Sequence, residues 1–253
     1  MKKCVFVVLA LLVSQVSYGQ LAYLQYRVVS DDNVEEFIEK ETKYWSKVAQ
    51  EAIDQGHLSG WSLWRKISVT EAESPNFVFV NTYDSIEKAG PSKVWTEENL
   101  RKLGVSIENA QTDSIAPVAF DYWMQVEDVI SGDHQFAIVN YAMPVSVGAF
   151  IEENKSLWKP LFEESIESGV GGMKAWGIMS VIFPRGSEGR FSVLTWDGFD
   201  SVADVMNYMR YTAGPPDAAW DKVLSNSKMD EINPGGFKSS IVYEKVMSLS
   251  AED

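Results

Sequence analysis

The chain contains one pattern twice, as VEEFIEKETKYWSKVAQEAIDQG at residues 34–56 and as VGAFIEENKSLWKPLFEESIESG at residues 147–169. The two stretches align without a gap at an offset of 113, and eight of their 23 positions are identical. The identical pairs are Val34/Val147, Phe37/Phe150, Ile38/Ile151, Glu39/Glu152, Trp45/Trp158, Glu51/Glu164, Ile53/Ile166 and Gly56/Gly169. Each stretch spaces its apolar residues as a helix does and ends on glycine, which suits the position after a helix C-terminus.

The repeat is expected to continue past this helix. A one-residue slip pairs Trp64 with Trp176, and the offset of 113 returns at Val80/Val193, Thr82/Thr195 and Asp84/Asp197. A repeat over this distance predicts two domains of roughly a hundred residues each rather than a short solenoid unit. On this alignment, the paired residues should occupy equivalent places in the two domains.

Segments typical of strands surround each repeated helix. Copy one has segments rich in β-branched and aromatic residues at 21–29, 61–69, 76–83 and 118–126, with a second helical and irregular stretch up to residue 115. Copy two has the corresponding segments at 136–143, 174–183, 190–196 and 237–246, with helices at 145–169 and 200–211. The copies differ most between their third and fourth strands, which contain Gly90-Pro91 and Gly214-Pro215-Pro216. Both copies have the order β-α-β-β-α-β, the ferredoxin-like pattern.

The N-terminus has the features of a secretory signal peptide. Lys2 and Lys3 precede an apolar run at residues 5–13, and Ser17-Tyr18-Gly19 places small residues at the −3 and −1 positions of a cleavage site. The run is too short to span a bilayer. We therefore expect residues 1–19 to be removed and the protein to be exported, to the bacterial periplasm or outside the cell. The rest divides into a module at 20–128, a linker at 129–134, a module at 135–248 and a tail at 249–253.

Composition argues against several classes of function. Cys4, the single cysteine, lies in the signal peptide, so the mature chain should have neither a disulfide nor a thiol nucleophile. Loss of Lys2 and Lys3 leaves 20 basic against 36 acidic residues, a charge of −16 that disfavours nucleic acid and anionic membranes as partners. His57 and His134 have no second histidine at ligand spacing, and no phosphate loop or nucleophile elbow occurs. We expect no metal and no cofactor.

A polar residue interrupts the apolar stripe of each repeated helix. Glu41 lies in mid-stripe close to Trp45, and its repeat partner Asn154 lies close to Trp158. Burial of an unpaired carboxylate is costly, so Glu41 should have a hydrogen-bond partner, a raised pKa or a cavity beside it. One interpretation is a ligand cavity between helix and sheet, with Tyr26 and Trp64 as further walls. The other is that Glu41 reaches solvent or bonds a strand residue such as Tyr26.

Strand alternation gives a second group of candidate residues. Arg27 and Asn81 share the parity of Gln25 and Tyr83, opposite to the parity of Tyr26. If the two sheets face each other, Arg27 and Asn81 should lie at the barrel interface. There they either hold a ligand carboxylate or form a hydrogen-bond network between the modules.

The duplicated β-α-β-β-α-β unit with an aromatic first helix resembles the dimeric α+β barrel superfamily. That superfamily includes small cofactor-free monooxygenases, haem-degrading enzymes and stress-responsive barrel proteins. The resemblance implies an α+β fold in which two tandem ferredoxin-like modules pair their sheets into one barrel within the chain. It brings no motif that assigns a role to any residue.

Two functions are consistent with the sequence. The first is an exported barrel that binds a small apolar or aromatic molecule, or that associates with itself as a homo-oligomer. The second is a cofactor-free monooxygenase-like or isomerase-like enzyme, with Glu41 as base and Tyr26 or Trp64 as hydrogen-bond donor to an aromatic or enolisable substrate. The sequence favours the first, because it shows neither a clear acid–base pair nor a set of metal ligands.

Overall fold

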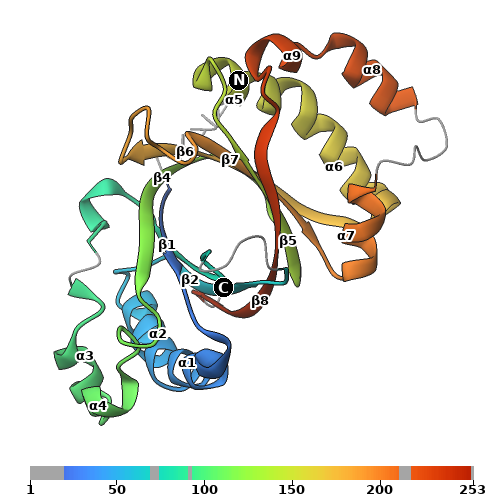
Figure 1. Ribbon diagram of the computed structural model, residues 1–253. Coiled ribbons are helices and arrows are strands. Elements are labelled where there is room, and N and C mark those ends of the chain that lie inside the picture. Colours follow the sequence, from blue (N-terminus) through green and yellow to red (C-terminus); the bar gives the residue numbers. More distant parts are fainter. Residues whose placement is uncertain (1–19, 69–73, 91–92, 211–217, 252–253) are drawn as a thin grey trace, which may run out of the picture.

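Eight strands form one closed antiparallel barrel with the helices outside it (Figure 1). The computed structural model describes residues 20–68, 74–90, 93–210 and 218–251. Around the barrel the strands follow the order β1-β3-β2-β8-β5-β7-β6-β4. Their bounds are β1 (Leu21–Arg27), β2 (Gly60–Lys66), β3 (Phe77–Tyr83), β4 (Val118–Ile130), β5 (Phe136–Ala142), β6 (Met173–Phe183), β7 (Val193–Phe199) and β8 (Phe237–Ser250).

Helices cover two opposite sides of this barrel (Figure 1). One side carries α1 (Val34–Lys40), α2 (Ser46–Asp54), α3 (Glu97–Lys102) and α4 (Ile107–Ala110). The other carries α5 (Val147–Glu153), α6 (Lys159–Ser168), α7 (Val202–Met209), α8 (Ala218–Asn226) and α9 (Met229–Ile232). As predicted, glycine follows each repeated helix in the left-handed region, with φ of 69° at Gly56 and 71° at Gly169. None of the described helices is long and apolar enough to cross a membrane.

The strand order confirms the predicted fold class. Each module has the ferredoxin-like order, β4-β1-β3-β2 in the first and β8-β5-β7-β6 in the second. The modules join where β2 pairs with β8 and β4 pairs with β6, so the fourth strand of each covers an edge of the other. The chain is therefore an α+β protein in which two tandem ferredoxin-like modules close one barrel.

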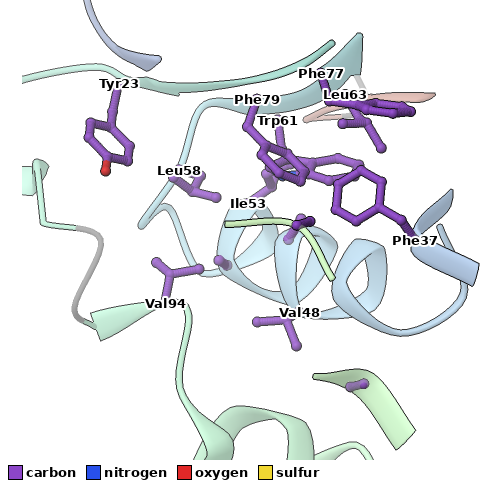
Figure 2. Close-up of a cluster of buried hydrophobic side chains, with 14 of the residues drawn as sticks. Tyr23, Phe37, Val48, Ile53, Leu58, Trp61, Leu63, Phe77, Phe79 and Val94 are labelled. Carbon is purple, nitrogen blue, oxygen red and sulfur yellow. The ribbon is translucent and has the colours of Figure 1, made fainter. Parts of the chain in front are cut away.

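Closure of the barrel separates three cores. Leu24, Tyr26 and Tyr141 belong to the core inside the barrel. Outside it, the first module packs α1 and α2 on its sheet through residues that include Phe37, Trp61 and Phe79 (Figure 2). The second module has a similar outer core, which contains Phe150, Phe162, Trp176 and Phe199. A side chain on a strand therefore faces either the barrel core or the helices, according to its parity.

The repeat alignment holds through the helix and is lost in the strands. The first hairpin closes with the Lys66 N–H on the Asn76 carbonyl and the second with the Val181 N–H on the Ser192 carbonyl, so the offset is 115 between β2 and β6 and 116 between β3 and β7. Thr82 pairs with Ala22, a barrel-core residue, whereas Thr195 lies opposite Ile178 of the outer core. The predicted correspondences Val80/Val193, Thr82/Thr195 and Asp84/Asp197 are therefore wrong, because the offset of 113 does not continue into the strands.

The slip that paired Trp64 with Trp176 is also wrong. Trp64 packs against the barrel core and Trp176 belongs to the outer core, so the two rings lie on opposite faces of the sheet. At the offset of 115, Trp64 corresponds to Met179 of the barrel core, and Trp176 corresponds to Trp61 of the first outer core. Beside Trp176, the Trp196 ring lies against the backbone of Gly177.

Other differences concern where elements end. β4 continues to Ile130 and β8 to Ser250, each beyond the predicted end of its strand, and α8 and α9 were not predicted. The predicted signal peptide at 1–19, Pro91, and Gly214-Pro215-Pro216 lie outside the described residues.

The Gly177 position gives a test of this packing. An added Cβ at Gly177 would overlap the ring of Trp196, so we expect Gly177→Ala to destabilise the protein by about 1–3 kcal/mol, as overpacking does. An added Cβ at Gly148 in α5 would meet no atom within 4 Å. Gly148→Ala should therefore be neutral or stabilise the protein by up to about 1 kcal/mol. Urea unfolding of both variants measures the difference, and equal stabilities would contradict the close approach of Trp196.

Candidate ligand-binding site

Both repeated helices contain a π-helical turn at the same place. The turn spans Glu41–Trp45 between α1 and α2, and Asn154–Trp158 between α5 and α6. The N–H of Ser46 donates to the carbonyl of Glu41, and that of Lys159 to the carbonyl of Asn154, five residues earlier in each case. Such turns are frequent at functional sites. The two polar residues singled out from the sequence each begin a π turn.

Glu41 is a buried carboxyl group with one hydrogen-bond donor. Glu41 is only 4% exposed, and Thr112 Oγ1 donates a hydrogen bond to Glu41 Oε1 over 2.8 Å. Burial raises the pKa of Glu41 to about 7, although the Thr112 hydrogen bond and the Arg27 charge both act to lower it. The sequence predicted a partner, a raised pKa or a cavity. The partner is Thr112 rather than Tyr26.

The cavity beside Glu41 has a volume of about 400 Å³. It lies between the π turn of the first module and the outward face of strands β1, β2 and β3. Residues between 95 and 113 close its remaining side. This volume is within the range of small-molecule sites. The residues that line it are Tyr23, Gln25, Arg27, Glu41, Trp45, Trp61, Phe79, Asn81, Trp95, Glu97, Ile107, Gln111, Thr112 and Asp113.

Aromatic rings form one wall of this cavity. Trp95 lies between Trp45 and Trp61, at centroid distances of 6.1 and 6.5 Å. The Trp61 ring continues to Phe79 at 6.0 Å, and both rings appear beneath the sheet in Figure 2. The indole nitrogen of Trp45 donates to the Ala110 carbonyl over 2.9 Å, which fixes that ring. A flat apolar ligand would find rings to contact on this side.

A row of polar side chains along β1 lines the cavity next to Phe79. Arg27 Nε donates to Gln25 Oε1 over 2.8 Å, and Gln25 Nε2 donates to the Tyr23 hydroxyl over 3.1 Å. The Tyr23 hydroxyl in turn donates to Asp121 Oδ2 over 2.8 Å, and burial raises the pKa of Tyr23 to about 12. Arg27 Nη1 also donates to the Ala116 carbonyl over 2.6 Å. The row holds the guanidinium in place, where its charge acts on Glu41.

Asn81 adds a polar atom without a partner. Its Nδ2 donates to the Tyr23 carbonyl over 3.2 Å, but its Oδ1 is buried and accepts no hydrogen bond within the part of the chain that the structure describes. Asn81 lines the cavity, so this oxygen is an acceptor for a ligand donor.

Four of the residues predicted from the sequence lie together at this cavity: Glu41, Trp45, Arg27 and Asn81. The prediction that Arg27 and Asn81 lie at the barrel interface is wrong, because their parity faces the helices. Tyr26 and Trp64 are not walls of this cavity, since both pack with the barrel core. On β1 the apolar parity of Leu24 and Tyr26 faces the barrel core, but on β3 the rings of Phe77 and Phe79 share the outward parity of Asn81.

The equivalent place in the second module is filled by aromatic rings. Asn154 is 6% exposed and its Nδ2 donates to the Phe150 carbonyl of its own helix over 2.9 Å. Phe162 occupies the position that Ala49 has in the first module. Its ring lies 6.2 Å from Trp158, 5.7 Å from Trp176 and 6.2 Å from Trp220. The two modules therefore differ in the space beside their π turns.

The second module has a buried carboxyl group elsewhere. Asp197 on β7 is 4% exposed and accepts from Asn140 Nδ2 over 2.8 Å. Burial raises its pKa to about 7, against the effect of that hydrogen bond. No group of His, Cys, Asp and Glu residues in the described ranges could hold a metal ion.

Several lining residues were missed from the sequence. Trp61 and Tyr23 share the outward parity of their strands, and a correct assignment of faces finds them. Thr112 and Trp95 lie in the irregular part of the segment between β3 and β4, where no periodic pattern indicates which side chains turn inward.

Comparisons with known proteins bear on the fold. No family model matches the sequence, and no curated protein matches it. The chain is similar to the crystal structure of an anthrone oxidase-like protein, with a TM-score of 0.53 and 16% identity over 93% of this chain and 94% of that one. Two proteins named “putative monooxygenase” are also similar. The one from Lactobacillus acidophilus has a TM-score of 0.54 and 10% identity over 92% and 96% of the chains, and the one from Fusobacterium nucleatum has 0.56 and 12% over 93% and 98%.

These similarities define the class of protein. The chain has the dimeric α+β barrel fold, built by two modules of a single chain. The low identities show the shared fold alone.

The burial of Glu41 predicts a dependence of stability on pH. The pKa of Glu41 rises from 4.5 to about 7 on folding, so the folded state binds more protons between these values. The stabilisation is therefore fully present below about pH 4 and is lost as the pH rises to about 7. We expect Glu41→Gln to be more stable than the wild type at pH 8 by about 3 kcal/mol, and nearly equal at pH 4.

Asp197→Asn is the matched control, since Asp197 is a buried carboxyl of similar pKa outside the cavity. Each substitution should remove its own part of the pH dependence, and the double variant should remove both. Denaturant unfolding between pH 4 and pH 8 measures the effect. A Glu41→Gln protein with the wild-type pH profile would show that the pKa of Glu41 does not change on folding.

Proposed function

We propose that the cavity of the first module binds a small planar aromatic molecule that carries a phenolic or enolic hydroxyl group. The observation that supports this most directly is the Glu41 carboxyl, which has a pKa near neutrality and opens into a cavity walled by indole rings. A buried titratable group in a cleft is a usual mark of a functional site.

The body of such a ligand would contact the ring wall. Trp45, Trp61 and Trp95 present apolar surface on one side, and Phe79 extends it towards the sheet. Aromatic pairs with ring centroids about 4.5–7 Å apart contribute free energy beyond that of burying their apolar surface. A planar molecule gains most from this arrangement.

The hydroxyl of the ligand would donate to Glu41. Thr112 already donates to Oε1, which leaves Oε2 and the remaining lone pairs of the carboxylate for a further donor. A hydrogen bond to an ionised carboxylate is stronger than one to a neutral acid. Asn81 Oδ1 provides a second acceptor for a ligand with two hydroxyl groups.

Affinity for a neutral phenol should consequently increase with pH. With a pKa of about 7, Glu41 is mostly protonated at pH 6 and mostly ionised at pH 8. The apparent dissociation constant is the intrinsic one divided by the ionised fraction, so it should fall about tenfold over this interval. Calorimetric titration with 2-naphthol measures it, with 2-methoxynaphthalene as the ligand that lacks the donor.

Two variants separate the site from general effects of pH. Glu41→Gln should bind 2-naphthol more weakly than the wild type at pH 8 and with little change between pH 6 and 8. Asp197→Asn should retain the wild-type profile. Equal affinity of 2-naphthol and its methyl ether for the wild type would contradict a hydroxyl-binding role for Glu41.

A second candidate function is an enzyme that uses Glu41 as a base. A pKa near the working pH suits a general base, and Arg27 supplies a positive charge beside the cavity. Proteins of similar fold carry the names “anthrone oxidase-like protein” and “putative monooxygenase”. In this proposal Glu41 takes a proton from an enolisable aromatic ketone and leaves the enolate, the step that oxygenation and isomerisation share.

Deuterium exchange tests this step directly. In heavy water, the protein should accelerate exchange at the acidic carbon of anthrone, as followed by proton NMR. Glu41→Gln should reduce the acceleration by at least about a hundredfold, the usual contribution of a general base. Asp197→Asn should exchange like the wild type. If the protein binds 2-naphthol but anthrone exchanges no faster than in buffer alone, the result would exclude the enzymatic function and support the binding function.

A further inference from the structure

A second cavity, of about 450 Å³, lies at one end of the barrel. Its lining comes from the last residues of β1, β2 and β5, from the first residues of β4 and β8, and from the segments that precede β3 and β7. It opens between the two sheets, on the other face of β1 from the Glu41 cavity. We call it the barrel-mouth cavity.

Three tyrosine hydroxyls meet in this cavity. The hydroxyl of Tyr141 lies 3.1 Å from that of Tyr26 and 3.1 Å from that of Tyr243. All three residues are buried, with exposures of 3%, 7% and 4% for Tyr26, Tyr141 and Tyr243. Burial raises the pKa of each well above its ordinary value, so each keeps its proton.

The three tyrosine hydroxyls have one more donor hydrogen than the hydrogen bonds among them use. Three hydroxyls supply three donors, and the two hydrogen bonds among them use two, whichever direction each bond takes. None of the three hydroxyls has another hydrogen-bond acceptor among the described residues. One buried O–H is therefore left without an acceptor among the described residues, beside a cavity that all three tyrosines line, an arrangement that calls for a ligand.

The described residues of the lining carry charge of one sign. Of the twelve described residues that line the cavity, three are basic and none is acidic. Arg190 and Lys238 form no ion pair within the described part of the chain, and the amino group of Lys66 donates to Ser74 Oγ over 2.9 Å. This is notable in a chain with a formal charge of −14. The cavity is a local site of positive charge on an acidic protein.

Aromatic surface completes the cavity. Phe120 and Phe191 line it, and the Arg190 guanidinium carbon lies 4.4 Å from the centroid of the Phe120 ring. Phe191 lies 4.8 Å from Tyr141. An occupant thus meets apolar rings as well as a hydroxyl donor and two cations.

We propose that the barrel-mouth cavity is a second binding site, which takes a small carboxylate with an aromatic body. The unused tyrosine proton donates to the carboxylate, Arg190 and Lys238 supply the charge, and the rings hold the body. Hydrogen bonds to an ionised acceptor are among the stronger ones, which favours an anion over a neutral ligand. The site is separate from the Glu41 cavity and does not depend on the function proposed for it.

Fluorine NMR titration with 4-fluorobenzoate tests the proposal, with 4-fluorobenzyl alcohol as the neutral control ligand. The protein without residues 1–19 should bind 4-fluorobenzoate. It should bind 4-fluorobenzyl alcohol at least about tenfold more weakly. Arg190→Gln and Lys238→Gln should each weaken binding of the carboxylate, by about tenfold for the double variant. Lys222→Gln, an exposed lysine on α8, should leave it unchanged.

Two further measurements test which cavity binds 4-fluorobenzoate and whether the aromatic body is required. Glu41→Gln should leave binding of 4-fluorobenzoate unchanged, because that group lies in the other cavity. Inorganic phosphate should displace 4-fluorobenzoate poorly. Displacement at equal concentration would overturn the requirement for an aromatic body. Absence of binding, or binding insensitive to Arg190→Gln and Lys238→Gln, would overturn the site itself.

Discussion

The pairing of β2 with β8 and of β4 with β6 is the constraint on which the structure depends. A ferredoxin-like sheet alone leaves unpaired backbone groups along two edges, and these pairings cover them. Closure also gives every strand an inside and an outside. Once Tyr26 faces the barrel, Gln25 and Arg27 on the same strand must face the helices. The polar row beside Glu41 thus follows from the way in which two sheets close.

The helices then decide which module has a cavity. Both contain a π turn that begins at a polar residue, so the distortion itself is shared. The difference lies in side-chain volume, because Phe162 fills a position where the first module has the methyl group of Ala49. Thr112 and Trp95 complete the cavity from the segment between β3 and β4, whereas in the second module Trp220 of α8 packs on both Trp158 and Phe162. A repeated backbone with unequal side chains therefore provides one cavity and one packed core.

Much of this architecture could be predicted from the sequence. The repeat at 34–56 and 147–169 indicated two modules, and the interruption of its apolar stripe identified Glu41. The faces of the strands could not be assigned, because alternation separates two faces without saying which one closes the barrel, and Tyr26, Trp64, Arg27 and Asn81 were misplaced for that reason. Thr112 had no periodic signal. The false match of Thr82 with Thr195 shows that short identities do not fix a register when the offset between the copies changes from helix to strand.

The unequal side chains of the two hairpins also affect the symmetry of the barrel. The strand order repeats after four strands, so the two hairpins lie at the same end. In an assembly of two identical subunits, any side chain of this hairpin would appear twice around the same opening. Covalent connection of the modules removes that requirement. Arg190 and Phe191 line the opening from the hairpin after β6, whereas the hairpin after β2 contributes Ser74 and Pro75. A tandem chain can in this way give a symmetric scaffold an asymmetric entrance.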